Sequence, residues 1–169
     1  ADNATEKVTL PSRQVVERNV RLQFAESAIS YHPVIAEGRN SREPSLIPPM
    51  NERSIIGCTD CHSSDTSVAA GSGGPNGPHG SNNRPLLIAP YETSPGTSES
   101  AAAYALCYRC HDRNSILNNQ SFPGHRQHIV DQRTSCATCH DAHGIPITGD
   151  THLGKTHLIN IDLTSVQAL

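Results

Sequence analysis

Apolar residues in this chain occur in short groups, and polar, Gly-rich or Pro-rich stretches separate them. The apolar residues between positions 15 and 24 stand among charged ones, which predicts a strand or an extended arm. Residues 158–163 alternate between apolar and polar side chains, which predicts an edge strand near the C-terminus. Residues 41–49 and 71–78 are interrupted by Pro and Gly and are predicted to be loops.

Two stretches have the features of helix starts. Ser98 is positioned to cap a helix that runs through three alanines at 101–103 to Leu106. A second helix is predicted to begin at Ser121-Phe122-Pro123 and to carry His125 and His128. The pattern as a whole predicts short helices and few strands joined by much coil.

Every cysteine of the chain lies in one of three copies of the pattern Cys-x-x-Cys-His. In a helical turn, residues i, i+3 and i+4 lie on one face, so two sulfur atoms and an imidazole can reach one flat ligand. The pattern is typical of covalent c-type haem attachment. We therefore expect three covalently attached haem c groups. Their thioether residues are Cys58, Cys61, Cys107, Cys110, Cys136 and Cys139, and their iron ligands are His62, His111 and His140.

Paired cysteines also occur in zinc sites, in thioredoxin-like redox centres and in disulfide scaffolds of secreted chains. None of these uses requires a histidine directly after the second cysteine. Histidine supplies only 10 of the 169 residues, so its presence after all three pairs is not expected by chance. The pattern therefore favours haem over zinc and over disulfides.

The composition is poor in the residues that build an ordinary core. Apolar residues make up 35% of the chain, aromatic residues 4%, and there is no Trp. Such a chain has difficulty offsetting its ordering entropy, and porphyrins would supply the missing apolar surface. We expect mostly irregular coil with short α-helices and few short strands, wrapped around a haem core. The expected segments are an N-terminal arm (1–57), a trihaem core (58–144) and a C-terminal extended segment (145–169), forming one compact domain overall.

Charge and hydropathy exclude two classes of partner. The net charge is −3 and the pI is about 6.4, so no polybasic surface is expected to bind nucleic acid. No apolar run is long enough for a membrane span. Because haem c is attached outside the cytoplasmic membrane, we expect that a signal peptide has been removed before Ala1. The expected location is extracellular or at the cell surface, with the periplasm as the alternative.

The second axial position on each iron needs a further ligand. Three of the 10 histidines lie in the motifs, which leaves seven, and Met50 is the only methionine. At least two haems must therefore use a second histidine, and three His pairs are the natural assignment. His152, His157 and Met50 are not expected to be ligands.

Four of the remaining histidines are the predicted ligands for the three open positions. The set holds one histidine more than the irons need, and a surplus histidine has the option of bonding a haem propionate. The first motif is followed by Pro-His-Gly at His79 and the third by Ala-His-Gly at His143, a weak internal repeat that predicts matching roles. His128 lies on the predicted helix between the second and third motifs, and His125 is its alternative one turn earlier. His32, in a cysteine-free segment, is the fourth, and it also has the option of reaching a haem in a neighbouring copy.

Several segments around these histidines match a known pattern. They are Tyr31–Val34, Gly77–Ser81, Leu106–Asp112, His125–Val130, Cys139–Gly144 and His157–Asp162. Together they resemble secreted multihaem c-type cytochromes of metal-respiring bacteria, over most of residues 31–163. The resemblance implies extracellular electron transfer to other cytochromes or to extracellular acceptors. It also evokes cytochromes that polymerise into conductive filaments, which would make copies of this chain its partners.

Three His-ligated haems held close together predict an electron relay rather than an enzyme. A second histidine on each iron leaves no position for a substrate, and imidazole pairs favour a lower potential than a His/Met pair. One alternative is a nitrite- or hydroxylamine-type multihaem reductase, which needs one open haem. Others are a monomeric periplasmic electron shuttle and a structural or adhesion protein in which haem is incidental.

Overall fold

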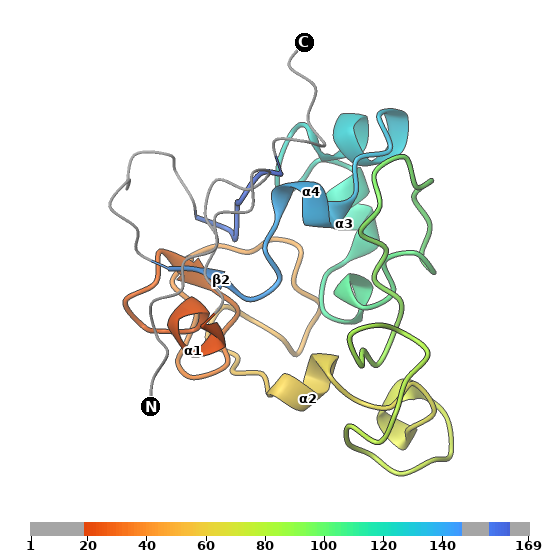
Figure 1. Cartoon of the computed structure of the whole chain (residues 1–169). Coiled ribbons are helices and arrows are strands. Elements are labelled where there is room, and N and C mark those ends of the chain that lie inside the picture. The colour runs from red at the N-terminus through yellow and green to blue at the C-terminus, as the bar shows by residue number, and fades with distance from the viewer. Residues whose placement is uncertain (1–18, 147–155, 163–169) are drawn as a thin grey trace. The chain divides into compact units, whose positions relative to one another are not determined.

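Short helices joined by long stretches of coil make up the protein, seen here in a computed structural model that describes residues 19–146 and 156–162. This confirms the expectation of short helices, few strands and much coil (Figure 1). None of the helices in the described ranges is long and apolar enough to cross a bilayer. The elements are α1 (Val20–Gln23), α2 (Cys58–Cys61), α3 (Arg113–Leu117) and α4 (Cys136–Cys139), the 3₁₀ turns η1 (Val68–Ala70) and η2 (Cys107–Arg109), the π-helical turn η3 (Gln127–Asp131), and the strands β1 (Ser30–Tyr31) and β2 (Gly144–Ile145).

The chain forms two compact units, and each combines segments that are distant in sequence. Unit 1 contains the described parts of Ala1–Glu43, Glu52–Ile55 and Cys136–Leu169. Unit 2 contains Pro44–Asn51 and Ile56–Ser135. The third Cys-x-x-Cys-His motif therefore lies in unit 1, and the first two lie in unit 2. The three-segment division made from the sequence stays a prediction.

Unit 1 is organised around one short antiparallel strand pair. Ser30 of β1 lies opposite Ile145 of β2, and Tyr31 lies opposite Gly144. Ile145 is completely buried. A Cβ atom at Gly144 would overlap the carbonyl oxygen of Gln23. Only glycine therefore allows β2 to approach the backbone of Gln23 this closely.

Two strands expected in unit 1 are absent from the described residues. Val20–Gln23 forms the helical turn α1, whose backbone is capped by the side chain of Asn19, so the predicted strand is wrong from residue 20 on. Val15 and Val16 lie outside the described residues. The predicted edge strand is also wrong over 158–162, because a tight turn is followed by isolated bridge residues, Ile159 and Asp162, rather than by a continuous strand. Residue 163 lies outside the described part.

The buried apolar side chains of unit 2 include Tyr104, Leu87 and Ile88. The loops predicted at 41–49 and 71–78 are confirmed, apart from isolated bridge residues. The segment carrying His125 and His128 is helical, as predicted, and its last part is the π-helical turn η3.

The prediction of a helix that starts at Ser98 is wrong, because residues 101–106 form successive turns instead. The N–H of Leu106 donates to the carbonyl of Pro90 at 3.0 Å, and the carbonyl of Ala103 accepts from the N–H of Glu92 at 2.9 Å. These long-range bonds take backbone groups that a helix would have used internally. Tertiary pairing thus overrides the helix preference of the three alanines.

Glu99 connects the segment before the second motif to α3. Its carboxylate accepts two hydrogen bonds from Arg113, at 2.8 and 2.5 Å, and one from the Tyr108 hydroxyl at 3.0 Å. The Glu99 side chain is 5% exposed and that of Arg113 is 39% exposed. The hydrogen bond from Arg113 is the main reason that the pKa of Glu99 is lowered below its ordinary value of 4.5.

Replacing Glu99 by Gln is expected to reduce the free energy of unfolding at pH 7 by about 1–2 kcal/mol, because the carboxylate is buried while the guanidinium is partly exposed. A lowered pKa means that the contribution is present above pH 4.5 and is lost as the pH falls through the folded-state pKa. Denaturant unfolding of the haem-loaded protein should therefore show the two proteins converging in acid. Glu37→Gln, at an exposed position, is the control. A constant difference between pH 7 and pH 3 would contradict this account.

Candidate functional site

Each of the three Cys-x-x-Cys-His motifs forms one helical turn, as the spacing predicts. The N–H of each motif histidine donates to the carbonyl of the first cysteine, at 2.7 Å for His62, 3.0 Å for His111 and 2.9 Å for His140. This i to i−4 bond closes the turn and brings the two cysteines and the histidine toward one face. The turns are α2, η2 and α4.

The six cysteines all lie in the described part of the chain, and none of them forms a disulfide. Cys58 is exposed and the other five are partly buried. The structure therefore gives no support to a disulfide scaffold. Two thiols per turn remain available for thioether bonds.

The first and second motifs lie within electrostatic reach of each other in unit 2. Burial raises the pKa of Cys61 to about 11, and the thiol of Cys110, Asp60 and the thiol of Cys107 raise it further. Burial also raises the pKa of Cys110, which Arg109 partly opposes. Effects that run between the two motifs show that unit 2 brings their cysteines close together.

The imidazoles of the first and third motifs are held through the same ring nitrogen. Nδ1 of His62 lies 3.1 Å from the carbonyl oxygen of Pro85, and Nδ1 of His140 lies 2.9 Å from the carbonyl oxygen of His157. A carbonyl only accepts, so Nδ1 carries the proton and the lone pair is on Nε2. Metal-binding histidines are typically oriented in this way, by a hydrogen bond from the other ring nitrogen.

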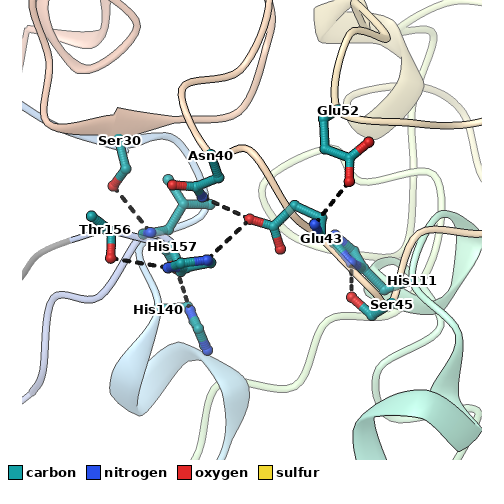
Figure 2. Close-up of polar contacts among 10 residues, drawn as sticks. Ser30, Asn40, Glu43, Ser45, Glu52, His111, His140, Thr156 and His157 are labelled. Atoms are coloured by element: carbon teal, nitrogen blue, oxygen red, sulfur yellow. Dashed lines mark hydrogen bonds and ion pairs between the residues drawn. The ribbon is translucent and has the colours of Figure 1, made fainter. Parts of the chain in front are cut away.

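The second motif follows the same plan with a side-chain partner. Nδ1 of His111 lies 2.9 Å from Oγ of the buried Ser45 (Figure 2). The backbone of the same loop is also paired with the motif, because Asp112 donates to the Ser45 carbonyl at 2.6 Å and Ile47 donates to the Cys110 carbonyl at 2.9 Å. All three motifs thus combine two thiols and a fixed imidazole, a donor set that fits a covalently attached haem.

Unit 1 brings two of the predicted second ligands to the third motif. Nδ1 of His32 donates to the carbonyl of Ala142 at 2.5 Å, and its backbone N–H donates to the carbonyl of His143 at 2.9 Å. Burial lowers the pKa of both His32 and His140, and the charge of His32 lowers that of His140 further. The two imidazoles therefore lie within electrostatic reach of each other.

His143 is also fixed in unit 1. Its Nδ1 lies 2.7 Å from Oε1 of Gln23, and its ring packs against Phe24 with centroids 5.1 Å apart. It lowers the pKa of His32, though less than burial does. His32, His140 and His143 thus form one cluster.

The predicted second ligands of unit 2 differ from one another. His79 uses its other ring nitrogen, because Nε2 donates to the carbonyl of Asn76 at 3.0 Å. His125 places Nδ1 3.1 Å from Oγ of Ser121. His128, on η3, stacks on Phe122 at a centroid distance of 6.0 Å. The sequence ranks His128 before His125, and the hydrogen bond of His125 is the one that resembles those of the motif histidines.

The residues that orient the motif histidines were not found from the sequence. Pro85 and His157 act through backbone carbonyls, which every residue type possesses, so no sequence signal marks them. Ser45 acts through its hydroxyl, but the chain is rich in serine. Only the three-dimensional structure identifies these three acceptors.

Comparison with known proteins gives one match. Residues 48–115 match the family described as the doubled CXXCH motif, and the matched segment contains the first and second motifs. No curated protein and no solved structure matches the chain significantly. The family match indicates a c-type-cytochrome-like segment that binds more than one haem.

Proposed function

We propose that this protein is a trihaem c-type cytochrome that relays electrons between closely spaced haems, each with two axial histidines. The observation that carries the proposal is the repeated local geometry. All three motifs form a turn with two thiols, and in all three Nδ1 of the histidine is tied to an oxygen atom. The family match covers the first two motifs, and the third shares their geometry, which supports a count of three.

The residues of the chain have distinct tasks in this proposal. When bound, each haem supplies a one-electron Fe(III)/Fe(II) couple. The cysteines anchor the macrocycle, and the motif histidine binds iron through Nε2. The Nδ1–H···O bonds increase the basicity of these imidazoles, which favours the ferric state and a low potential. A second histidine on each iron excludes substrates.

Several large apolar side chains are exposed in each unit. Val68 and Phe122 of unit 2 are 62% and 46% exposed, and Ile35 and Ile55 of unit 1 are 56% and 59% exposed. A porphyrin ring bound in either unit would find apolar side chains to pack against, which is compatible with the proposal.

One observation favours the second candidate function, a reductase with an open haem. Nε2 of His79, the nitrogen that an iron would take, is bonded to the carbonyl of Asn76. If His79 keeps this bond, the haem that it was predicted to serve needs another ligand or has an open side. His125 and His128 in the same unit supply two further imidazoles, so the relay remains the favoured function.

The finer parts of the proposal concern location and assembly. We infer an extracellular or cell-surface protein whose partners are other cytochromes or extracellular electron acceptors, with copies that associate end to end. The resemblance of residues 31–163 to secreted multihaem cytochromes supports this. An edge strand at 158–163 would have offered unpaired backbone groups to another copy. In the described residues 158–162, backbone groups of Leu158, Asn160 and Asp162 pair instead with the third motif of the same chain, so this segment does not support assembly.

The haem count is tested by intact mass. The purified protein should exceed its polypeptide mass by three haems, and acid-acetone extraction should leave all of them attached because thioether bonds survive it. A Cys136→Ser, Cys139→Ser variant should retain two. A wild-type mass with two haems or none would contradict the trihaem proposal.

Replacing His32 by Ala is expected to convert about one third of the haem from low-spin to high-spin, because His32 lies beside the third motif in the same chain. Absorption and electron paramagnetic resonance spectra of the oxidised protein measure the fraction. His152→Ala is the control, since His152 is outside the predicted ligand set. A fully low-spin His32→Ala protein would remove His32 from the ligands.

Assembly is tested by electron microscopy of the purified full-length protein across a range of concentrations. End-to-end association predicts filaments whose length increases with concentration, because a head-to-tail contact that does not close into a ring builds an open filament. Particles that remain single at every concentration would point to the monomeric shuttle.

A further inference from the structure

A turn from the C-terminal segment, at His157 and Leu158, is bonded through the backbone to the end of the third motif. The N–H of Asp141 donates to the carbonyl of Leu158 at 2.8 Å, and the N–H of Asn160 donates to the carbonyl of Cys139 at 2.8 Å. Ile159 forms an antiparallel bridge with His140. The turn is thus paired to the motif on both sides of the iron-binding histidine.

The turn has an unusual backbone. His157 and Leu158 have φ angles of 58° and 61°, so two successive residues that are not glycine adopt the left-handed conformation. Each such residue costs roughly 1 kcal/mol or more, and it persists only where surrounding contacts hold it. The result of this geometry is that the carbonyl oxygen of His157 lies 2.9 Å from Nδ1 of His140.

Side chains from three segments hold this turn in place (Figure 2). Nε2 of His157 lies 3.4 Å from Oε1 of Glu43, and its Nδ1 lies 2.9 Å from Oγ1 of Thr156. Oγ of Ser30, which is almost completely buried, accepts the N–H of Leu158 at 3.0 Å. The ring of His157 is therefore anchored on one side while its carbonyl supports His140 on the other.

Glu43 is itself fixed. Its Oε1 accepts from Nδ2 of Asn40 at 2.7 Å, and its backbone N–H donates to Oε1 of Glu52 at 3.0 Å. Its side chain is 23% exposed, so the carboxylate is mostly shielded from water. Glu43 is thus held in place by contacts other than the one to His157, as a residue that supports a metal ligand needs to be.

We propose that Glu43 and His157 are positioning residues that set the reduction potential of the haem at the third motif. Glu43 holds the ring of His157, the strained turn directs the His157 carbonyl to Nδ1 of His140, and the bond strengthens His140 as an electron donor to iron. The inference rests on the proposed function, because it needs a haem at this motif. At the other motifs the acceptors are the Pro85 carbonyl and the Ser45 hydroxyl, so the effect is specific to the third haem.

The test is a potentiometric titration of the haem-loaded protein, followed by NMR of haem methyl groups assigned to each motif. In Glu43→Gln, the reduced-to-oxidised ratio of the third haem at a fixed potential should increase about tenfold. This takes the lower end of the roughly 10–100-fold that residues supporting a metal ligand contribute to metal affinity or activity. A tenfold change corresponds to 59 mV for a one-electron couple. The first and second haems should change little.

A second variant separates positioning from loss of charge. His157→Asn keeps the Glu43 carboxylate and tolerates the left-handed conformation, but it shortens the side chain that reaches Glu43. It should shift the third haem in the same direction. The double variant should shift it no further than the larger single effect, because both residues act through one carbonyl. Glu92→Gln, which removes a carboxylate charge from unit 2, is the matched control.

The outcomes are distinguishable. A wild-type protein without haem at the third motif refutes the proposed function itself. Three low-spin haems, with a shift in Glu43→Gln and none in His157→Asn, would show a simple charge effect and overturn the positioning role. Equal shifts of all three haems would overturn it as well. If Glu43→Gln does not fold, His157→Asn decides by the same criterion.

Discussion

The structure depends on a hydrogen bond between the imidazole of each motif histidine and an oxygen atom in another part of its unit. For His62 the partner is 23 residues away, for His140 it is 17, and for His111 it is 66. Each bond fixes the ring that is expected to bind iron. It also fixes a loop, because the acceptor belongs to a coil segment with no regular element to hold it. Cofactor site and chain path are therefore determined by the same contacts.

Small hydroxyl side chains occupy many of the buried positions that apolar side chains fill in an ordinary core. Ser67 is completely buried and donates to the carbonyl of Ser64 at 2.7 Å, and Ser135 donates to the carbonyl of Thr93 at 2.9 Å. In a coil, backbone carbonyls lack the partners that helices and sheets provide, and a buried carbonyl without a partner is costly. Serine satisfies them with little volume, which allows loops to pack closely.

The sequence was sufficient where the local chemistry is decisive. The three motif turns, the loops at 41–49 and 71–78, and the helical segment with His125 and His128 were all predicted. Prediction failed where distant segments compete for the backbone. The alanines at 101–103 prefer a helix, but pairing with residues 90–92 replaces it. Within the described residues 158–162, the apolar alternation gives way to a turn and to bonds with the third motif. The acceptors of the motif histidines were invisible for the same reason.

The choice of the second axial ligands shows how structure and sequence pattern give different information. The sequence repeat ranks His79 and His143 first, because each stands in an x-His-Gly sequence that follows a motif, after a loop for His79 and at once for His143. The ring nitrogens provide another criterion, since an imidazole that binds through Nε2 is commonly held at Nδ1. Among the described histidines outside the motifs, His32 and His143 are held at Nδ1 by amide or backbone oxygens, and His125 by a hydroxyl. Two of these three lie in unit 1, which holds one motif, and the third lies in unit 2, which holds two motifs and also contains His128. His157, which is also bonded at Nδ1, is distinguished from them because its Nε2 faces a carboxylate and its carbonyl supports His140. A histidine near a motif is therefore not necessarily a ligand, because His157 supports His140 through its backbone carbonyl while its own ring is held by Glu43 and Thr156.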